Sequence, residues 1–239
     1  MAHQKTAAIV LAAGRGSRMK SNVQKQYLLL KEKPVLYYSL KAFEDSFIDE
    51  IVLVTGKEEI GYCRREIVDR YGFQKVSHIA AGGKERYHSV FCGLQALSDC
   101  DYVFIHDGAR PFVTEAILER AYAAVQKEHA CVVGMPVKDT IKLADEDGYA
   151  QDTPRRDLLW TVQTPQVFEF PLILSAYTSF MQQEQELLAQ GVKITDDAMV
   201  AERFSDARVR LVEGSYENIK ITTPEDLLIA EALLDTDIF

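Results

Sequence analysis

The chain lacks the features that mark secreted, membrane-spanning and nucleic-acid-binding proteins. Among its 239 residues the longest purely apolar run is Ala7–Ala13, whereas a bilayer-spanning helix needs about 20 such residues. Met1–Lys5 shows no basic start leading into an apolar run and a cleavage site. Basic residues number 27 against 36 acidic ones, and the net charge of −9 repels phosphate backbones and anionic lipids. We therefore expect no nucleic-acid and no membrane partner.

Cysteine is scarce and is not arranged as a site. The four cysteines are Cys63, Cys92, Cys100 and Cys131, and no two have CxxC spacing. This spacing argues against a zinc knuckle and a thioredoxin-type centre. Scattered thiols without an export signal are typical of reduced core residues, so we expect a cytoplasmic protein.

Short apolar segments alternate with helical ones from the start of the chain to Pro136. The pattern predicts strands at residues 6–11, 50–55, 75–80, 102–106 and 130–134, and helices at 35–43, 58–71, 85–97 and 115–127, the last capped by Thr114. Such alternation indicates an α/β fold with a mostly parallel sheet and helices on both faces. The ligand site of such a sheet lies beyond the carboxyl ends of its strands, so the residues that follow each strand are the candidates.

After Pro136 the pattern predicts a projecting β-hairpin arm. Residues 137–143 alternate between polar and apolar, Asp145–Gly148 has the composition of a tight turn, and residues 149–153 return. Because an isolated hairpin is marginal in water, we expect the arm, residues 137–159, to pack against a second subunit. We assign the whole chain, 1–239, to a single domain. Beyond the arm the sequence predicts helices after Pro171, at 196–203 and after Pro224, and a strand at 208–213.

The first strand runs into a small-residue loop, Ala12–Gly16, whose exposed N–H groups can hold an anion. Met19 stands where a dinucleotide-binding fingerprint needs its third glycine, and the Gly-Lys-Ser/Thr of a P-loop is absent. Cations follow the loop instead: Arg15, Arg18, Lys20 and Lys25. The sequence therefore predicts a phosphate site that uses side-chain cations, although an ordinary tight βα turn is the simpler interpretation.

Two further loops follow strands at the same predicted edge. Gly82 and Gly83 permit close approach of the backbone to a ligand, and Arg86 and Ser89 share one face of the helix that follows. Asp107 follows the fourth strand, and a carboxylate beside phosphate-binding loops is typical of a Mg²⁺ ligand. The simpler interpretation of the double-glycine segment is an ordinary loop before a helix, and that of Asp107 is a buried helix cap. His106 is better placed to orient its loop than to catalyse a reaction.

Taken together, six motifs resemble those of the 2-C-methyl-D-erythritol 4-phosphate cytidylyltransferases. In chain order they are AAGRGSRM with Lys25, GGKERYHSV, HDGARPF, TPQ, ITDDA and EGSYENIKITTPEDL. The resemblance implies a Rossmann-like nucleotidyltransferase domain and a homodimer whose arms exchange between subunits. It also implies a Mg²⁺-dependent reaction of CTP with the sugar phosphate. The products would be 4-diphosphocytidyl-2-C-methyl-D-erythritol and pyrophosphate, in the non-mevalonate isoprenoid pathway.

The resemblance also implies roles for individual residues. CTP would be surrounded by Ala12, Ala13, Gly14, Gly16, Gly82 and Ser89, and the metal would meet Asp107. The cations at the α-phosphate would be Arg18, Lys25 and Lys220. The methylerythritol phosphate would be framed by Arg110, Arg156, Thr164, Thr195 and Glu217. Two positions depart from the family's usual pattern: Gln24 replaces a proline, which would loosen the loop of Lys25, and Glu217 replaces an aspartate.

Three alternatives compete with this interpretation. A ribitol 5-phosphate cytidylyltransferase would share the glycine loop, the lysine and TPQ, but Ser89, the Leu-Trp before TPQ and the TDDA stretch favour the methylerythritol enzymes. An NAD-dependent oxidoreductase would need the missing third glycine and an acid after the second strand. A catalytically silent nucleotide sensor would not need Lys25, Asp107 and Arg156 together.

Overall fold

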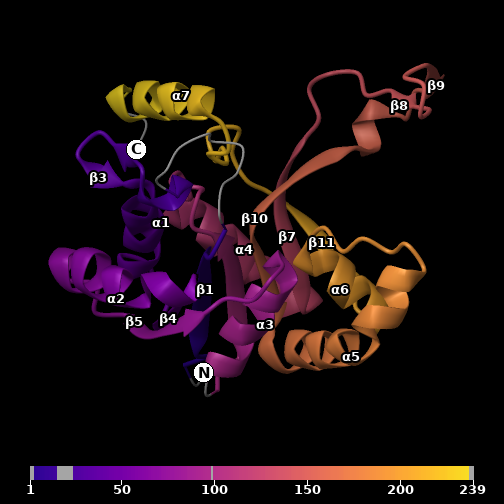
Figure 1. Ribbon diagram of the computed structural model, residues 1–239. Coiled ribbons are helices and arrows are strands. Elements are labelled where there is room, and N and C mark those ends of the chain that lie inside the picture. Colours follow the sequence, from indigo (N-terminus) through magenta and orange to yellow (C-terminus); the bar gives the residue numbers. More distant parts are fainter. Residues whose placement is uncertain (1–2, 15–23, 98, 237–239) are drawn as a thin grey trace.

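The computed structural model describes residues 3–14, 24–97 and 99–236. Its main sheet has seven strands in the order β11-β7-β10-β6-β1-β4-β5, and β10 alone among them runs antiparallel to its neighbours (Figure 1). These strands are β1 (Thr6–Ala12), β4 (Glu50–Thr55), β5 (Val76–Ala81), β6 (Tyr102–Asp107), β7 (Ala130–Pro136), β10 (Trp160–Glu169) and β11 (Arg210–Glu213). The predicted mostly parallel α/β sheet is confirmed.

Helices cover both faces of this sheet, and each face has its own apolar core. On one side lie α1 (Val35–Glu44) and α4 (Glu115–Glu128); on the other lie α3 (Arg86–Ala96), α5 (Phe170–Ala189) and α6 (Asp197–Phe204). Strand β1 serves both cores, because Ala8 and Val10 face the first and Ala7 and Ile9 face the second. Successive side chains of a strand point to opposite faces of the sheet, so a central strand that is covered on both faces is apolar along its whole length.

A third, smaller core lies beside the carboxyl edge of the sheet. It joins the C-terminal helix α7 (Pro224–Asp235) to the short hairpin β2 (Leu29–Leu30) and β3 (Lys33–Pro34), through side chains that include Leu30, Phe112 and Ile221. The described part of the chain contains no helix that is both long and apolar enough to cross a bilayer.

Two predicted helices differ in detail from the structure. The segment expected at 58–71 is a 3-10 turn, η3 (Lys57–Glu59), one α turn, α2 (Ile60–Tyr62), and a π-helix, η4 (Cys63–Asp69), with Gly72 at φ +71° just beyond. No residue type marks a π turn, so periodicity alone predicts a continuous helix. Thr114 does precede α4, but its hydroxyl caps no described backbone N–H.

Strand β10 was missed by the sequence pattern. It contains a proline and three buried polar residues, Gln163, Thr164 and Gln166, a composition that suggests a loop. Each of these polar side chains is hydrogen-bonded to a distant part of the chain: to Ser215, His106 and Asp197 respectively. Burial of polar groups is compatible with a central strand because these partners satisfy them.

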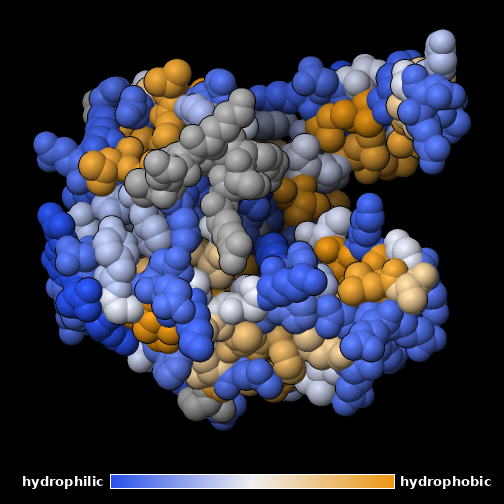
Figure 2. Space-filling model, viewed as in Figure 1, coloured by the Kyte–Doolittle hydropathy of each residue, from blue (hydrophilic) through white to orange (hydrophobic). Residues whose placement is uncertain are grey.

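The arm exists but pairs over a shorter length than predicted. Its strands are β8 (Leu143–Ala144) and β9 (Ala150–Asp152), and Gly148 at φ +87° completes the turn. Of the two predicted segments, 137–143 contributes only Leu143 to β8, whereas 149–153 contains the whole of β9. The arm stands away from the main body in Figure 1 and in the space-filling view of Figure 2, so β8 and β9 have no second layer among the described residues to pack on.

The cysteines are thiols in the structure. Cys63, Cys100 and Cys131 are buried, Cys92 is half-buried, and all four are free. The prediction of reduced core residues therefore holds for three of them.

Candidate active site

A cavity of about 640 Å³ lies at the carboxyl edge of the sheet, where the sequence predicted a ligand site. It is bounded by the loop after β1, the start of α3, the end of β6 and the segment before α7. Seven of the predicted site residues line it: Ala12, Ala13, Gly14, Lys25, Ser89, Asp107 and Lys220. Gly16 and Arg18 lie outside the described residues.

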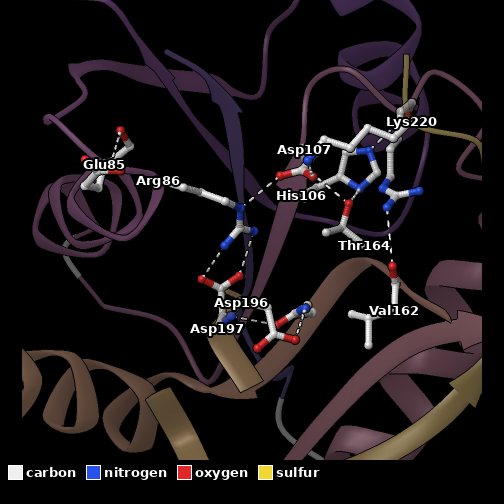
Figure 3. A network of polar contacts seen from close by, with 12 residues as sticks. Glu85, Arg86, His106, Asp107, Val162, Thr164, Asp196, Asp197 and Lys220 are labelled. Atoms are coloured by element: carbon white, nitrogen blue, oxygen red, sulfur yellow. Dashed lines mark hydrogen bonds and ion pairs between the residues drawn. The ribbon is translucent and has the colours of Figure 1, made fainter. Parts of the chain in front are cut away.

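Asp107 is the charged centre of this cavity. Its Oδ2 atom lies 2.6 Å from Lys220 Nζ and its Oδ1 atom 3.2 Å from Arg86 Nε (Figure 3). Burial by itself would raise the pKa of Asp107, but the charges of Arg86 and Lys220 hold that pKa well below its usual range. These two cations therefore favour the ionised form of the carboxylate.

Arg86 also binds a second carboxylate. Its two terminal nitrogens each donate a 2.8 Å hydrogen bond to one oxygen of Asp197, which is fully buried at the start of α6 (Figure 3). The sequence interpretation gave neither residue a role. The signals were present, an arginine after the double glycine and the aspartates of ITDDA, but the partners are 111 residues apart in the chain.

Behind Asp107, a buried hydrogen-bond chain fixes the end of β6. His106 Nε2 lies 3.1 Å from the carbonyl oxygen of Arg110, which can only accept, so this nitrogen carries the proton. Burial lowers the pKa of His106 to about 4, so the ring is neutral and Nδ1 accepts from the Thr164 hydroxyl at 3.0 Å. That oxygen in turn accepts the N–H of Asp107 at 3.1 Å. His106 thus orients its loop, as predicted.

Ser89 lines the cavity, and Gly82 does not line it but packs tightly against Ser89 and the loop after β1. A Cβ atom on Gly82 would lie 2.5 Å from the Cβ of Ala13 and 2.7 Å from Ser89 Oγ, so only glycine fits between the β1 loop and α3. The buried Ser89 hydroxyl accepts the N–H of Gly83 and donates to the carbonyl of Glu85. The two loops after β1 and β5 are therefore in direct contact.

The segment that carries Lys25 is held by glutamine side chains. Gln24 donates to Glu59 at 2.5 Å and accepts from Gln26 at 2.6 Å, and Gln26 also donates to the carbonyl of Ala12. Gln24 has φ −64°, the value that proline imposes. The segment thus keeps a proline-like backbone, and side-chain hydrogen bonds hold it.

The residues assigned to the sugar phosphate are more scattered. The described residues that line the cavity include none of the five assigned to this substrate, which are Arg110, Arg156, Thr164, Thr195 and Glu217. Thr195 is exposed just before α6 and Arg156 is exposed in the arm, where it donates to the carbonyl of Lys138.

Arg110 and Glu217 do not line the cavity and are held by neighbouring groups. Arg110 donates to the carbonyl of Asn218 at 2.8 Å, while its buried Nε has no partner among the described residues. The hydrogen bond from Ser215 lowers the pKa of Glu217 and turns its carboxylate toward its own loop.

The donor atoms suit a magnesium ion that arrives with a nucleotide. Within the described residues no three His, Cys, Asp or Glu side chains cluster as a metal cage, and Asp107 offers one ionised carboxylate to the cavity. Mg²⁺ typically takes one or two carboxylates and completes its shell with phosphate oxygens and water. Asp107 fits this pattern.

Comparison with known proteins gives one consistent result. The family model for 2-C-methyl-D-erythritol 4-phosphate cytidylyltransferase matches residues 6–236. Enzymes of that name from Lachnoclostridium phytofermentans and Lachnospira eligens are 50% and 52% identical, covering 97% and 95% of this chain and 97% and 98% of theirs. The crystal structure of the 4-diphosphocytidyl-2C-methyl-D-erythritol synthase from Anaerococcus prevotii is similar at a TM-score of 0.83 with 35% identity, covering 97% of this chain and 96% of that one.

Proposed function

The chain belongs to the 2-C-methyl-D-erythritol 4-phosphate cytidylyltransferase family, and from that premise we propose how its residues carry out the reaction. It is a nucleotidyltransferase that joins CTP and 2-C-methyl-D-erythritol 4-phosphate in the non-mevalonate isoprenoid pathway. The relatives compared above are all methylerythritol enzymes, and none of them supports the ribitol 5-phosphate alternative.

The reaction needs charge neutralisation more than proton transfer. A phosphate oxygen of the sugar phosphate attacks the α-phosphorus of CTP, the new P–O bond forms, the bond to the bridging oxygen breaks, and pyrophosphate leaves. Because the attacking oxygen is already anionic, no general base is required. The obstacle is the repulsion between two polyanions and the charge on the five-coordinate phosphorus, which fixed cations offset.

The cations of the site are proposed to lie around the α-phosphate. Lys25 and Lys220 line the cavity from opposite ends of the chain, and Arg18 is assigned the same role from outside the described residues. The observation that carries this assignment is the ionised Asp107 between Lys220 and Arg86 in a cavity that Lys25 also lines. In this arrangement Lys220 is held close to the reacting phosphates by a carboxylate.

The nucleotide is proposed to lie against the small residues of the two glycine loops. Ala12, Ala13, Gly14 and Ser89 line the cavity, Gly82 packs tightly against Ala13 and Ser89, and Gly16 is assigned with them. Small side chains here permit the backbone N–H groups to approach the ligand closely.

Magnesium is proposed as the divalent ion of the reaction, held by Asp107. When bound with CTP it would neutralise charge on the phosphate oxygens and on the departing pyrophosphate. Asp107 is suited to this role because Arg86 and Lys220 keep it ionised.

The sugar phosphate is proposed to be bound across a homodimer. Arg110, Thr164, Thr195 and Glu217 would frame it from one subunit, and Arg156 from the partner's arm would grip its phosphate with two parallel hydrogen bonds. The exposed position of Arg156 in the arm and the apolar side chains there, such as Leu143 and Leu158 at 51% and 66% exposed, support a second copy as the arm's partner. In this proposal the chain acts as a single domain, 1–239, with residues 137–159 as its dimerisation arm, and works in the cytoplasm, where its free thiols stay reduced.

The site is tested by pyrophosphate release with matched variants. Wild-type pyrophosphate release should disappear with a chelator and return with Mg²⁺. It should be faster with methylerythritol phosphate than with ribitol 5-phosphate as the second substrate. Asp107→Asn should lower kcat roughly 10²-fold or more. Asp45→Asn, an exposed carboxylate paired with Lys41, should leave kcat unchanged. Full turnover in Asp107→Asn or in chelator would contradict the proposal.

Mixing experiments test the exchange of arms. At methylerythritol phosphate well below the KM of Arg156→Ala, Lys25→Ala and Arg156→Ala are each expected to be weak enzymes alone, but a heterodimer contains one site with both residues intact. Random mixing should restore about a quarter of the wild-type sites. No recovery after subunit exchange would show that Arg156 does not act in the partner's site.

A further inference from the structure

The guanidinium of Arg86 connects two carboxylates that come from different elements. Its Nε atom meets Asp107 Oδ1 at the end of β6, and its terminal nitrogens form a parallel pair with Asp197 on α6 (Figure 3). A planar fork that is bound at one edge by two parallel bonds has a fixed orientation. With the fork held in this way, the single N–H on Nε points at Asp107.

Asp197 is itself prevented from moving. It is fully buried, and its Oδ1 atom also accepts the hydroxyl of Tyr177 on α5 at 2.5 Å. Its backbone N–H, with that of Ala198, donates to the side-chain oxygen of Gln166 on β10, at 3.0 and 2.8 Å. A buried carboxylate with every oxygen bound in this way is a rigid anchor for the arginine.

The two oxygens of Asp107 therefore have separate partners. Arg86 binds Oδ1 from the side of α3 and α6, and Lys220 binds Oδ2 from the segment before α7. If Arg86 released Oδ1, the carboxyl group could rotate about its own bond and Lys220 would lose its fixed partner.

We propose that Arg86 is a positioning residue of the cytidylyl transfer: anchored by Asp197, it sets the orientation of the Asp107 carboxylate and, through it, the place of Lys220. This inference rests on the proposed role of Asp107. Arg86 acts by shape as well as charge, because three of its N–H groups bind two separate carboxylates at once. A lysine ammonium would neutralise the same charge without forming the fork.

Arg86→Lys is therefore the informative change. It should lower kcat about 10–100-fold, the scale that follows from misplacing a reacting group by about 1 Å. The KM for methylerythritol phosphate should change less than about threefold, because Arg86 is not proposed to touch that substrate. Arg70→Lys, at an exposed arginine paired with Glu66, is the matched control and should keep wild-type kcat.

The control for a merely structural role is a double-mutant comparison. Arg86→Lys is measured alone and combined with Asp107→Asn, by kcat and by calorimetric titration of CTP in Mg²⁺. If Arg86 acts through Asp107, its substitution should lower kcat and weaken CTP binding in the wild-type background but change both less than about twofold in the D107N background. A structural role would instead lower the unfolding temperature and give equal fold-losses in both backgrounds.

The outcomes separate the two proposals. If D107N is inactive while R86K keeps wild-type kcat, or if the losses multiply, the positioning role of Arg86 is overturned and the role of Asp107 stands. If D107N is fully active, both are overturned. Should R86K fail to fold, Tyr177→Phe replaces it: loosening the anchor should lower kcat about threefold in the wild-type background and not in the D107N background. Equal kcat in Y177F and wild type would then overturn the inference.

Discussion

Replacing Gly82 by alanine is the sharpest test of how the glycine loops are packed. The added Cβ would lie 2.5 Å from the Cβ of Ala13 and 2.7 Å from Ser89 Oγ. The serine hydroxyl can rotate away, but the Cβ of Ala13 can move only with its backbone. An ordinary contact needs at least 3.4 Å, so the loop after β1 must shift by about 1 Å from α3.

The expected loss follows from that displacement. Misplacing a binding loop by about 1 Å typically costs on the order of 10²-fold in rate, so kcat/KM for CTP should fall about 10–100-fold. Overpacking of this kind also costs about 1–3 kcal/mol of unfolding free energy. The protein should therefore remain folded while its activity drops.

Steady-state pyrophosphate release, together with thermal unfolding, separates these two effects. Gly61→Ala is the control, because its Cβ would meet only Arg65 Nη1 at an ordinary 3.5 Å. Since Gly61 lies in the helical turn α2, that variant should keep its activity and gain roughly 0.5–1 kcal/mol of stability. If Gly82→Ala retained wild-type kcat/KM for CTP, the contact between the two glycine loops would not matter for the site.

Three further predictions concern charge. Lys25→Ala should lower kcat roughly 10²–10³-fold in the same assay, while Lys41→Ala, an exposed lysine paired with Asp45, should not; near-normal turnover in the first would exclude Lys25 from catalysis. Arg156→Ala should mainly raise the KM for methylerythritol phosphate, and an effect confined to CTP would contradict its assignment. The third prediction concerns Asp226 in the first turn of α7. Burial by itself would raise the pKa of Asp226, but hydrogen bonds from Thr222 and from the N–H of Thr223 lower it. The ionised Asp226 carboxylate therefore stabilises the fold above its pKa in the unfolded chain, and this stabilisation is lost as the pH falls through its pKa in the folded protein. In urea unfolding, Asp226→Asn should be less stable than the wild type by about 1 kcal/mol near neutral pH, and this difference should shrink toward about pH 3. A deficit that did not change with pH would contradict this.

The strands that were predicted well are those whose signal is local. β1, β4, β6 and β7 are apolar on both faces because both faces are covered, and this shows in the sequence as short apolar runs. β5, at the edge of the sheet, keeps only part of this pattern, since Ser77 and His78 are exposed. β10 has a polar sequence because its side chains bond to Ser215, His106 and Asp197, none of which is near in the chain. Its place between β6 and β7 could not be read from the sequence pattern.

The site residues also divide into those that a local sequence signal indicates and those whose partners are distant in the chain. The loops after β1, β5 and β6 meet because the carboxyl ends of parallel strands share an edge, so position alone made these loops candidates, and Ala12, Ser89 and Asp107 all line the cavity. The roles of Ala12 and Ser89 toward CTP came from the family resemblance. Arg86 was noticed only as a neighbour of Ser89. Its partnership with Asp197 depends on where the fold places the start of α6 relative to the start of α3, which no spacing in the chain records.

The amino-acid sequence by itself determined that this chain forms a parallel α/β sheet with small-residue loops and cations at one edge, because apolar periodicity and glycine placement act over a few residues. The tertiary structure decided which charges meet: that Asp107 lies between Arg86 and Lys220, that Asp197 anchors Arg86, and that Arg156 lies in the arm, outside the cavity of its own chain. Ion pairs of this kind join residues that are distant in sequence, and their geometry is set by the packing of whole elements.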